Sequence, residues 1–335
     1  MKLYRFSLLL FASIICSCSK DNPTKLNEVE DVCTQMDDLS FMSYCYKAFD
    51  VNKDGCVSMS EAAAADKIDI SGKGIKSLKG IQYFTGLEVL LCQENNLSEL
   101  DLSNNRKLKE LRCYSNQIPS LNLKNNPSIE ILYCGGNPLG SLDVSKLLSL
   151  KEFNCVENNL TKLNIKNNIN LEMISCGTNS IDELDVRQNP QLTVLDCEKN
   201  HIQKLDVTNN PLLREFYCGD NDISTLDLRN QTELKYFECY KNKLSSLDIT
   251  NCLSLKSIDC GVNELSSLDL SNNKKLENLY CDENSLTSLD ISNNTLLKIV
   301  YCEKNPYLTE IWLLRSQKFY EFVYDKSTAE LKYKN

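Results

Sequence analysis

Histidine is nearly absent from this chain, whose 335 residues include a single one, His201. One histidine provides no pair for a zinc site and little general-base chemistry, and nothing in the sequence places a nucleophile beside it. Positive charge is also scarce, since 46 acidic residues against 37 basic ones give a formal charge of −9. Non-specific nucleic-acid binding needs a strong basic field. We therefore expect neither an enzyme nor a nucleic-acid partner.

Two further features are missing. No Cys-x-x-Cys pair occurs, although the chain holds 17 cysteines, and metal-binding cysteines usually come in such pairs. After the first 18 residues, no apolar run approaches the length of a membrane-spanning helix. These absences argue against a thiolate metal site and against a spanning protein, and they leave the many cysteines to be explained.

The first 18 residues, MKLYRFSLLLFASIICSC, have a basic start, a short apolar run and small residues. This is the layout of a secretory signal. The end of the stretch resembles a bacterial lipobox, in which Ser17 precedes the lipidated Cys18. Cys16 fits less well because bulky Ile15 precedes it. The resemblance implies a signal peptide over 1–17, lipidation at Cys18, a tether over 18–30, and a lipid-anchored protein of the outer membrane that is exposed at the cell surface. The alternative is an ordinary signal peptide with incidental cysteines.

A 21-residue repeat fills most of the chain. Residues 87–107 read LEVLLCQENNLSELDLSNNRK and residues 108–128 read LKELRCYSNQIPSLNLKNNPS. The register continues without insertion to Leu297, giving eleven units of the form LxxLxCxxNxLxxLDLxxNxx. Cysteine stands at the sixth position and asparagine at the ninth position of every unit. Such a fixed period predicts a solenoid.

Alternation within the unit predicts which side chains point inward. Leu90 and Cys92 face the core while Val89 and Leu91 face out, as in a β-strand, and residues 97–102 repeat the alternation. We therefore predict two short extended segments per turn. Free cysteine behaves as a small buried hydrophobe, and parallel neighbours suit disulfide geometry poorly. The cysteines are thus predicted to form a buried ladder, and the ninth-position asparagines to satisfy backbone groups at the turn.

This pattern resembles the bacterial leucine-rich-repeat family, particularly its short-repeat, internalin-like proteins. The match covers about residues 66–313. It implies a mainly β fold, a right-handed leucine-rich-repeat solenoid of about eleven 21-residue turns. Residues 66–86 look like a degenerate first turn. Residues 314–335 are expected to form a β C-terminal cap that contains a strand or hairpin, because the exposed end of a solenoid needs a cover.

Residues 50–61, DVNKDGCVSMSE, fit the calcium-loop pattern D-x-[DN]-x-[DN]-G-x5-E at every specified position. The stretch 31–65 thus resembles an EF-hand or dockerin module and is expected to form a small α-helical N-terminal cap, with Ala48 on the apolar face of its first helix. The resemblance implies a structural calcium ion with these ligands: Asp50, Asn52, Asp54, Cys56, Ser58 and Glu61. An unoccupied turn kept for its shape is the alternative. Cys33 and Cys45 could bridge only if two short helices precede the loop, and their state is left open.

Function must come from the variable outward positions, because the inward ones only build the scaffold. Tyrosine gathers at the outward positions of the first strand, and tyrosine is enriched in interfaces. We expect glycines at the seventh position to open shallow pockets there, and the aspartates of the fifteenth position to form a solvated column. The predicted partner-binding residues are Arg112, Tyr114, Tyr133, Tyr217, Tyr236, Glu238, Tyr240, Tyr280 and Tyr301.

Two classes of function fit such a face. The first is protein–protein interaction or adhesion through the first-strand, concave face of a lipid-anchored surface protein. The second is glycan binding, in which aromatic faces and acidic side chains hold sugar rings. A third reading is that the tyrosines merely suit a strand surface. A monomer that touches the membrane only through its lipid anchor is expected.

Overall fold

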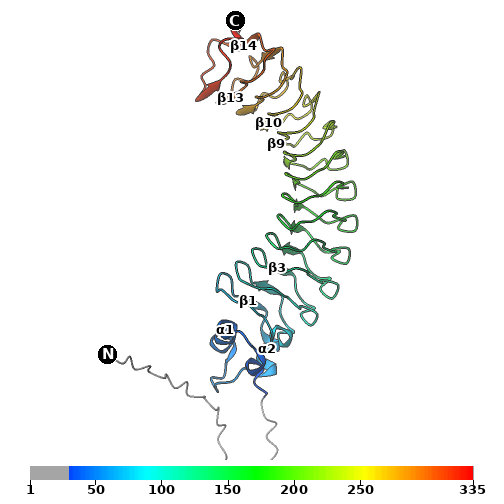
Figure 1. Cartoon of the computed structure of the whole chain (residues 1–335), viewed down its shortest axis with the longest axis vertical. Coiled ribbons are helices and arrows are strands. Elements are labelled where there is room, and N and C mark those ends of the chain that lie inside the picture. Colours follow the sequence, from blue (N-terminus) through cyan, green and yellow to red (C-terminus); the bar gives the residue numbers. More distant parts are fainter. Residues whose placement is uncertain (1–29, 335) are drawn as a thin grey trace, which may run out of the picture.

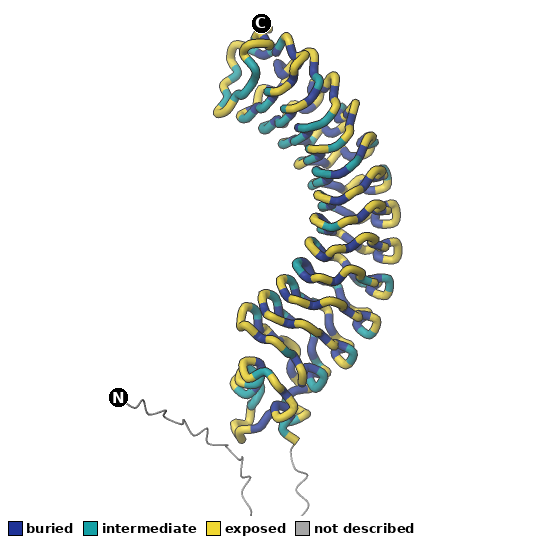
Figure 2. The backbone as a smooth tube through the Cα atoms, in the orientation of Figure 1, coloured by how far each residue is buried: buried dark blue, intermediate teal, exposed yellow. Residues whose placement is uncertain are grey.

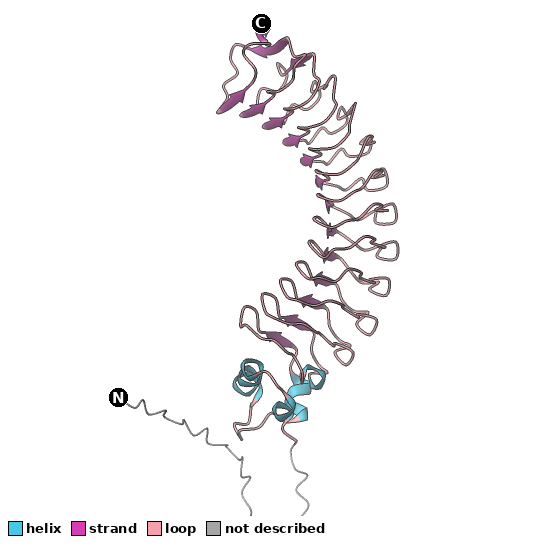
Figure 3. Cartoon of the chain, viewed as in Figure 1, coloured by secondary structure: helices cyan, strands magenta, loops and turns pink. Residues whose placement is uncertain are grey.

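The computed structural model describes residues 30–334, so the predicted signal peptide, Cys18 and nearly all of the predicted tether lie outside the described residues. The chain winds into a solenoid that bends into an open arc (Figure 1). Thirteen parallel strands form one sheet along the inner, concave side of this arc (Figure 3). They are β1 (Lys67–Asp69), β2 (Val89–Leu91), β3 (Glu110–Arg112), β4 (Ile131–Tyr133), β5 (Glu152–Asn154), β6 (Met173–Ser175), β7 (Val194–Asp196), β8 (Glu215–Tyr217), β9 (Tyr236–Glu238), β10 (Ser257–Asp259), β11 (Asn278–Tyr280), β13 (Ile299–Tyr301) and β15 (Glu321–Val323).

The predicted alternation is confirmed in the strands of this sheet. From β2 to β11, each strand residue pairs with the residue 21 positions along the chain, as Leu195 does with Phe216. In every strand of this sheet except β15 the middle residue is buried while its neighbours are partly or fully exposed, and Figure 2 shows buried and exposed residues mixed along the whole arc. Because the register equals the repeat length, equivalent side chains stack directly on one another.

The number of turns is larger than the eleven that the consensus predicts. β1 adds an entry turn that lacks the cysteine and asparagine of the repeat, and β15 adds an exit turn beyond the regular register. β15 pairs in parallel with β13, and residues 314–334 contain no hairpin. The chain simply makes another turn of the coil instead of folding back.

The second extended segment of each turn alternates as predicted, with Leu100 and Leu102 buried and Asp101 exposed, but it is mostly not a hydrogen-bonded strand. Within residues 30–334, only three strands pair on the convex side, all near the C-terminus: β12 (Ser288–Asp290), β14 (Glu310–Leu314) and β16 (Glu330–Lys334). Elsewhere side chains connect neighbouring turns, as where the Asn209 amide donates to the Arg187 carbonyl. Curvature explains the difference, since closely paired strands on the inner side spread the outer segments apart.

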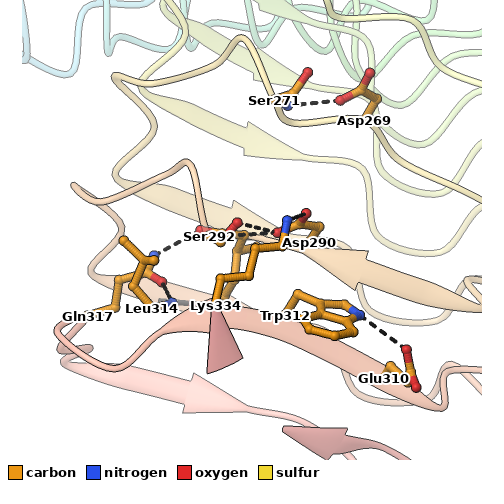
Figure 4. A network of polar contacts seen from close by, with 10 residues as sticks. Asp269, Ser271, Asp290, Ser292, Glu310, Trp312, Leu314, Gln317 and Lys334 are labelled. Atoms are coloured by element: carbon orange, nitrogen blue, oxygen red, sulfur yellow. Dashed lines mark hydrogen bonds and ion pairs between the residues drawn. The ribbon is translucent and has the colours of Figure 1, made fainter. Parts of the chain in front are cut away.

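Figure 4 shows the C-terminal turns. The Gln317 amide donates to the carbonyls of Ile291 and Asn294, at 2.9 and 3.1 Å, which is the role that asparagine has at the nineteenth position of regular turns. The Trp312 indole N–H donates to Glu310, and Lys334 pairs with Asp290. These contacts continue the regular structure through a stretch where the sequence period has broken.

Two ladders hold the turns together from inside. Every ladder cysteine is a buried free thiol, as predicted. The Asn116 amide donates to three carbonyls, including that of Cys92 in the turn before, and its Oδ1 accepts the Leu97 N–H at 2.9 Å. The asparagines at the nineteenth position also donate to backbone carbonyls of neighbouring turns. Cys252, whose state the sequence did not predict, occupies the nineteenth position of its repeat as a buried free thiol. The ninth-position asparagine therefore satisfies the backbone where the chain turns.

The N-terminal cap contains three short helices, η1 (Val32–Gln35), α1 (Leu39–Phe49) and α2 (Met59–Ala64), and a fourth, η2 (Ile81–Tyr83), lies in the entry turn. Asp38 caps α1, and Ser58 with Glu61 forms a capping box on α2. Cys33 and Cys45 sit on η1 and α1 as buried free thiols in contact, and that contact together with burial raises the pKa of Cys45. Ala48 is exposed, contrary to the prediction. No helix within residues 30–334 is long and apolar enough to cross a membrane.

Candidate functional site

The concave face is formed by the third, fifth and seventh positions of each repeat. The first two are the outer residues of each strand, and the seventh follows the buried cysteine. The predicted partner-binding residues all lie on these positions. The sheet therefore brings them onto one continuous face, but it places them in two groups with different surroundings.

The first group lies over β3–β5, and its charges are paired within the protein. The Arg112 guanidinium binds Glu110 at 2.5 Å and lies 4.7 Å from the centre of the Tyr133 ring. The Tyr133 hydroxyl donates to Glu152 at 2.6 Å, and burial followed by this bond raises the pKa of Tyr133 to about 12. Tyr114 lies beside them, half-buried. Arg112 is the only cation among the concave positions of β2–β11 and β13.

The second group lies over β8–β13 and is rich in tyrosine. The Tyr217 hydroxyl donates to Glu215 at 3.1 Å, whereas Tyr236 is 39% exposed. Tyr280 and Tyr301 stack with their ring centres 5.4 Å apart. The tyrosine faces thus remain available on a rigid sheet, as an interface requires.

Glycine alternates with larger residues at the seventh position, at Gly135, Gly177, Gly219 and Gly261. These glycines do not open pockets, contrary to the prediction, because side chains from the next turn cover them. A Cβ on Gly219 would lie 2.3 Å from the Tyr240 ring, and one on Gly177 would lie 3.1 Å from Asp196 Oδ1. The missing side chains let neighbours from different turns meet.

Carboxylates meet in this way over Gly219. Glu198 and Glu238 come from turns on either side of it, interact with each other, and lie near Asp196. Tyr240 leans across Gly219 and interacts with Glu198. Burial, then repulsion from Glu238 and Asp196, raises the pKa of Glu198 to about 7, and burial raises the pKa of Glu238.

Asp259 extends this cluster by one turn, because it pairs in register with Glu238. Burial, then repulsion from Glu238 and Asp282, raises the pKa of Asp259 to about 6. Glu198 is the residue that sequence reasoning missed. The signal that could have found it is the alternation at the seventh position, where Glu198 stands between two glycine turns. We call Asp196, Glu198, Glu238 and Asp259 the acidic patch.

The convex aspartate column behaves as an ordinary solvated face. Asp101 Oδ1 accepts the Ser103 N–H at 2.9 Å, and Asp206 accepts both the N–H and the hydroxyl of Thr208. These bonds lower the pKa of Asp101 and of Asp206. Each carboxylate is thus satisfied within its own turn while it stays exposed, whereas the acidic patch is partly buried.

The predicted calcium loop lies between α1 and α2, as an EF-hand-like loop should. Asp50 accepts the N–H groups of Asp54 and Gly55, at 3.1 Å each. Glu61 reaches back to accept the N–H of Val51 at 3.0 Å and that of Asn52. Asp54 accepts from Cys56 and from the Asn52 amide, and Glu61 also accepts from Ser58.

The predicted ligand oxygens are therefore gathered in one short loop with donor chemistry suited to calcium. Their present partners are N–H and hydroxyl groups. Within residues 30–334 no three His, Cys, Asp or Glu side chains converge so as to hold a metal ion.

No protein-family profile and no curated protein sequence matches the chain. Among solved structures it is similar to the functional domain of InlJ from Listeria monocytogenes, which includes a cysteine ladder, with a TM-score of 0.84 and 32% identity over 90% of this chain and 71% of that one.

Two other similar structures show the same fold. One is the internalin InlF from Listeria monocytogenes, with a TM-score of 0.75, 20% identity and coverage of 88% of this chain and 93% of that one. The other is a leucine-rich-repeat protein of Leptospira interrogans, with a TM-score of 0.63, 20% identity and coverage of 76% and 74%. The chain belongs to the internalin-like leucine-rich-repeat proteins, whose fold commonly mediates protein–protein interaction or adhesion.

Proposed function

We propose that this protein is a lipid-anchored, cell-surface binding protein that recognises a protein partner through the concave face of its sheet. The observation that carries the proposal is the contrast between the two sides of that sheet. Its inward positions repeat the same cysteine and asparagine in turn after turn, whereas its outward positions hold tyrosines and carboxylates that differ from turn to turn. A uniform scaffold that displays a varied, half-exposed face is suited to recognition.

The tyrosines over β8–β13 support a protein partner. Tyr236 is exposed, and Tyr280 and Tyr301 stack on neighbouring strands, so a partner would meet rigid aromatic surface with little loss of side-chain freedom. The same rings could hold sugars, which makes glycan binding the competing function.

The test is capture of extracellular proteins by the full chain, run beside a glycan array. A Tyr217→Ala/Tyr236→Ala/Tyr240→Ala variant is expected to lose protein capture and to leave the array unchanged. The matched control is Asp101→Asn/Asp143→Asn on the convex side, which should capture as well as the wild type. Binding of glycans that the tyrosine variant loses would favour the competing function, and equal capture by all three proteins would exclude the concave face.

The lipid anchor is a separate part of the proposal. Cys18 carries the lipid in this account, and the polar residues after it form the start of the tether. Metabolic labelling with a fatty acid should mark the wild type and not the Cys18→Ser variant, while Cys16→Ser should label normally. Protease treatment of intact cells should then remove the repeats if they face outward. Equal labelling of both variants would contradict an anchor at Cys18.

The N-terminal loop is proposed to bind calcium as a structural ion. Asp50, Asn52, Asp54, Ser58 and Glu61 would contribute side-chain oxygens and Cys56 its carbonyl, and the ion would replace the N–H groups that these carboxylates now accept. Calcium of extracellular modules binds at about 0.1–1 mM. Because α2 packs against η2 of the entry turn, an ion here would stabilise the start of the solenoid.

Thermal melting of the full chain tests this part. Millimolar calcium should raise the melting temperature of the wild type, and a chelator should reverse the rise. Asp50→Asn/Glu61→Gln should abolish it, whereas Asp69→Asn, an acidic change outside the loop, should retain it. An unchanged melting temperature of the wild type in millimolar calcium would contradict calcium binding by this loop.

A further inference from the structure

The acidic patch is unusual because its carboxylates have no salt-bridge partner within residues 30–334. Asp196, Glu238 and Asp259 are outward strand residues at the fifth position, and Glu198 stands at the seventh position next to Asp196. Adjacent parallel strands lie about 4.8 Å apart, so these carboxylates crowd within four neighbouring turns. The concave positions of β7–β11 contain no lysine or arginine.

The acidic side chains over β3–β5 show that the same sheet can balance its charges. There Glu110 has Arg112 as its partner, and Glu152 accepts from Tyr133. In the acidic patch, Asp196 accepts the Ser175 hydroxyl at 2.7 Å and the Glu198 N–H at 3.2 Å, neither of them a cation, and Glu198 Oε1 is shielded from solvent without a hydrogen-bond partner. A shielded carboxylate oxygen with no donor is costly unless something else supplies one.

The glycines add no side chain of their own, so only neighbouring groups cover the backbone at these positions. The Glu198 carbonyl lies over Gly177, and the other groups that cover Gly177, Gly219 and Gly261 are mainly the ends of Asp196, Tyr240 and Asp282. These are side-chain ends that an arriving group can displace. Tyr217 and Tyr240 flank the carboxylates with aromatic faces, which attract cations as well as apolar surface.

We propose that the acidic patch and its two tyrosines, Tyr217 and Tyr240, form the docking site for a cationic segment of a protein partner, whose lysine or arginine side chains supply the missing donors. This inference rests on the proposed function and specifies the chemistry of the partner. Charge complementarity selects the occupant, because a segment lying across the strands would place its cations over several carboxylates at once. A metal ion fits less well, since no three of these side chains converge on one point within the described residues.

The site should also respond to pH. The groups that face Glu198 from its own and neighbouring turns are Asp196, Lys199, Glu238 and Tyr240, and those near Asp259 are Glu238, Tyr280 and Asp282. Only Lys199 among them is cationic, and its influence on Glu198 is the smallest of these. Acidification from pH 8 to pH 5.5 protonates the most crowded carboxylates first, so it should weaken the docking of a cation.

The experiment is fluorescence anisotropy of the full chain with a labelled (Lys-Ser)6 peptide, and (Glu-Ser)6 as the opposite-charge probe. The lysine peptide should bind at pH 8 and low salt, and binding should fall at least tenfold for Glu198→Gln/Glu238→Gln. The matched control Glu110→Gln/Glu152→Gln removes the same two charges from the other group on this face and should bind as the wild type does. Binding should also weaken at pH 5.5.

Equal loss in both double variants would show that the peptide senses only net charge, and it would overturn the proposal. So would failure of the lysine peptide to bind, or binding of the glutamate peptide. If the tyrosine variant still loses capture of a protein partner while Glu198→Gln/Glu238→Gln captures normally, the proposed function stands and the cationic site is wrong. Circular dichroism and melting of each variant would show that it is folded.

Discussion

The two groups on the concave face share one scaffold and differ in how their charges are balanced. Over β3–β5, Arg112, Glu110, Tyr133 and Glu152 pair with one another, whereas over β7–β10 the acidic patch has no internal cation. Beneath both groups the cysteines and ninth-position asparagines make the same contacts. The difference teaches that the scaffold does not decide the chemistry of the face. A turn can hold either a self-sufficient surface or one that needs a partner.

The largest expected effect tests whether the scaffold is the same beneath both groups. Asn116→Ala and Asn221→Ala each remove a side chain that donates to three carbonyls and accepts one N–H. Each should destabilise the protein by about 3 kcal/mol, because several buried groups lose their partner. Urea denaturation measures the loss. A loss that differs strongly between the two variants would mean that the two regions differ inside as well as outside.

The next effect concerns how closely neighbouring turns meet. Gly219→Ala places a Cβ 2.3 Å from the Tyr240 ring, so the ring must move, and a cost of about 1–2 kcal/mol is expected. Gly135→Ala meets Asn154 Oδ1 at 2.9 Å and the Val156 carbonyl at 3.0 Å, and should cost less. Urea denaturation of the two variants would measure which one loses more stability. The reverse order would show that Tyr240 swings away freely and is not held against Glu198.

Between pH 5 and pH 8, the pH dependence of stability should come mainly from the acidic patch, because the hydrogen-bonded convex aspartates have lowered pKa values and contribute at more acidic pH. The pKa of Glu198 is about 7 and that of Asp259 about 6 in the folded chain, above their unfolded values of 4.5 and 3.8. The folded state therefore binds more protons, so stability falls as the pH rises from about 4 to 7. Melting temperatures at pH 5 and pH 8 should differ, and Glu198→Gln should reduce the difference. Glu152→Gln, from the other group, should leave it unchanged, and an equal reduction there would refute the assignment.

The smallest effect on stability is expected for exposed ion pairs at the edges of the two regions, which we call their rims. Lys109 pairs with Glu88 in the first region and Lys298 with Glu277 near the end of the second, and all four side chains are about a third to a half exposed. Exposed pairs contribute little, so Lys109→Ala and Lys298→Ala should both melt like the wild type. A clear drop in melting temperature for one of them would reveal an unequal contribution of the rims.

The scaffold could be predicted from the sequence because a strict period leaves little freedom. Once Cys92 and Asn95 recur every 21 residues, only a stack of turns places all of them equivalently. The exit turn was harder, since Gln317 replaces an asparagine two residues out of register and preserves its contacts by its greater length. The near absence of strand pairing on the described part of the convex side could not be predicted, because alternation shows which way a residue faces and not how far apart neighbouring turns lie.

The acidic patch could be predicted only in part. Glu238 belonged to the predicted site because it is an outward strand residue, but Glu198 did not, since its importance depends on Gly219 in the turn between them. That relation spans residues 40 positions apart, so no local pattern displays it. Tyr240 was predicted as a partner-binding residue, whereas its position across Gly219 is visible only in the folded chain.

The alternation of glycine with larger residues at the seventh position gives this solenoid two different repeat lengths. The core repeats every 21 residues. From Gly135 to Asp282, however, the seventh position of the concave face repeats every 42, because glycine and a larger residue alternate there from one repeat to the next. Removing one repeat from this region would preserve the ladder of ninth-position asparagines and yet bring two bulky residues, or two glycines, side by side. Removing two would restore both patterns. Lengthening or shortening of the protein by duplication or deletion in this region should therefore be tolerated in pairs of repeats.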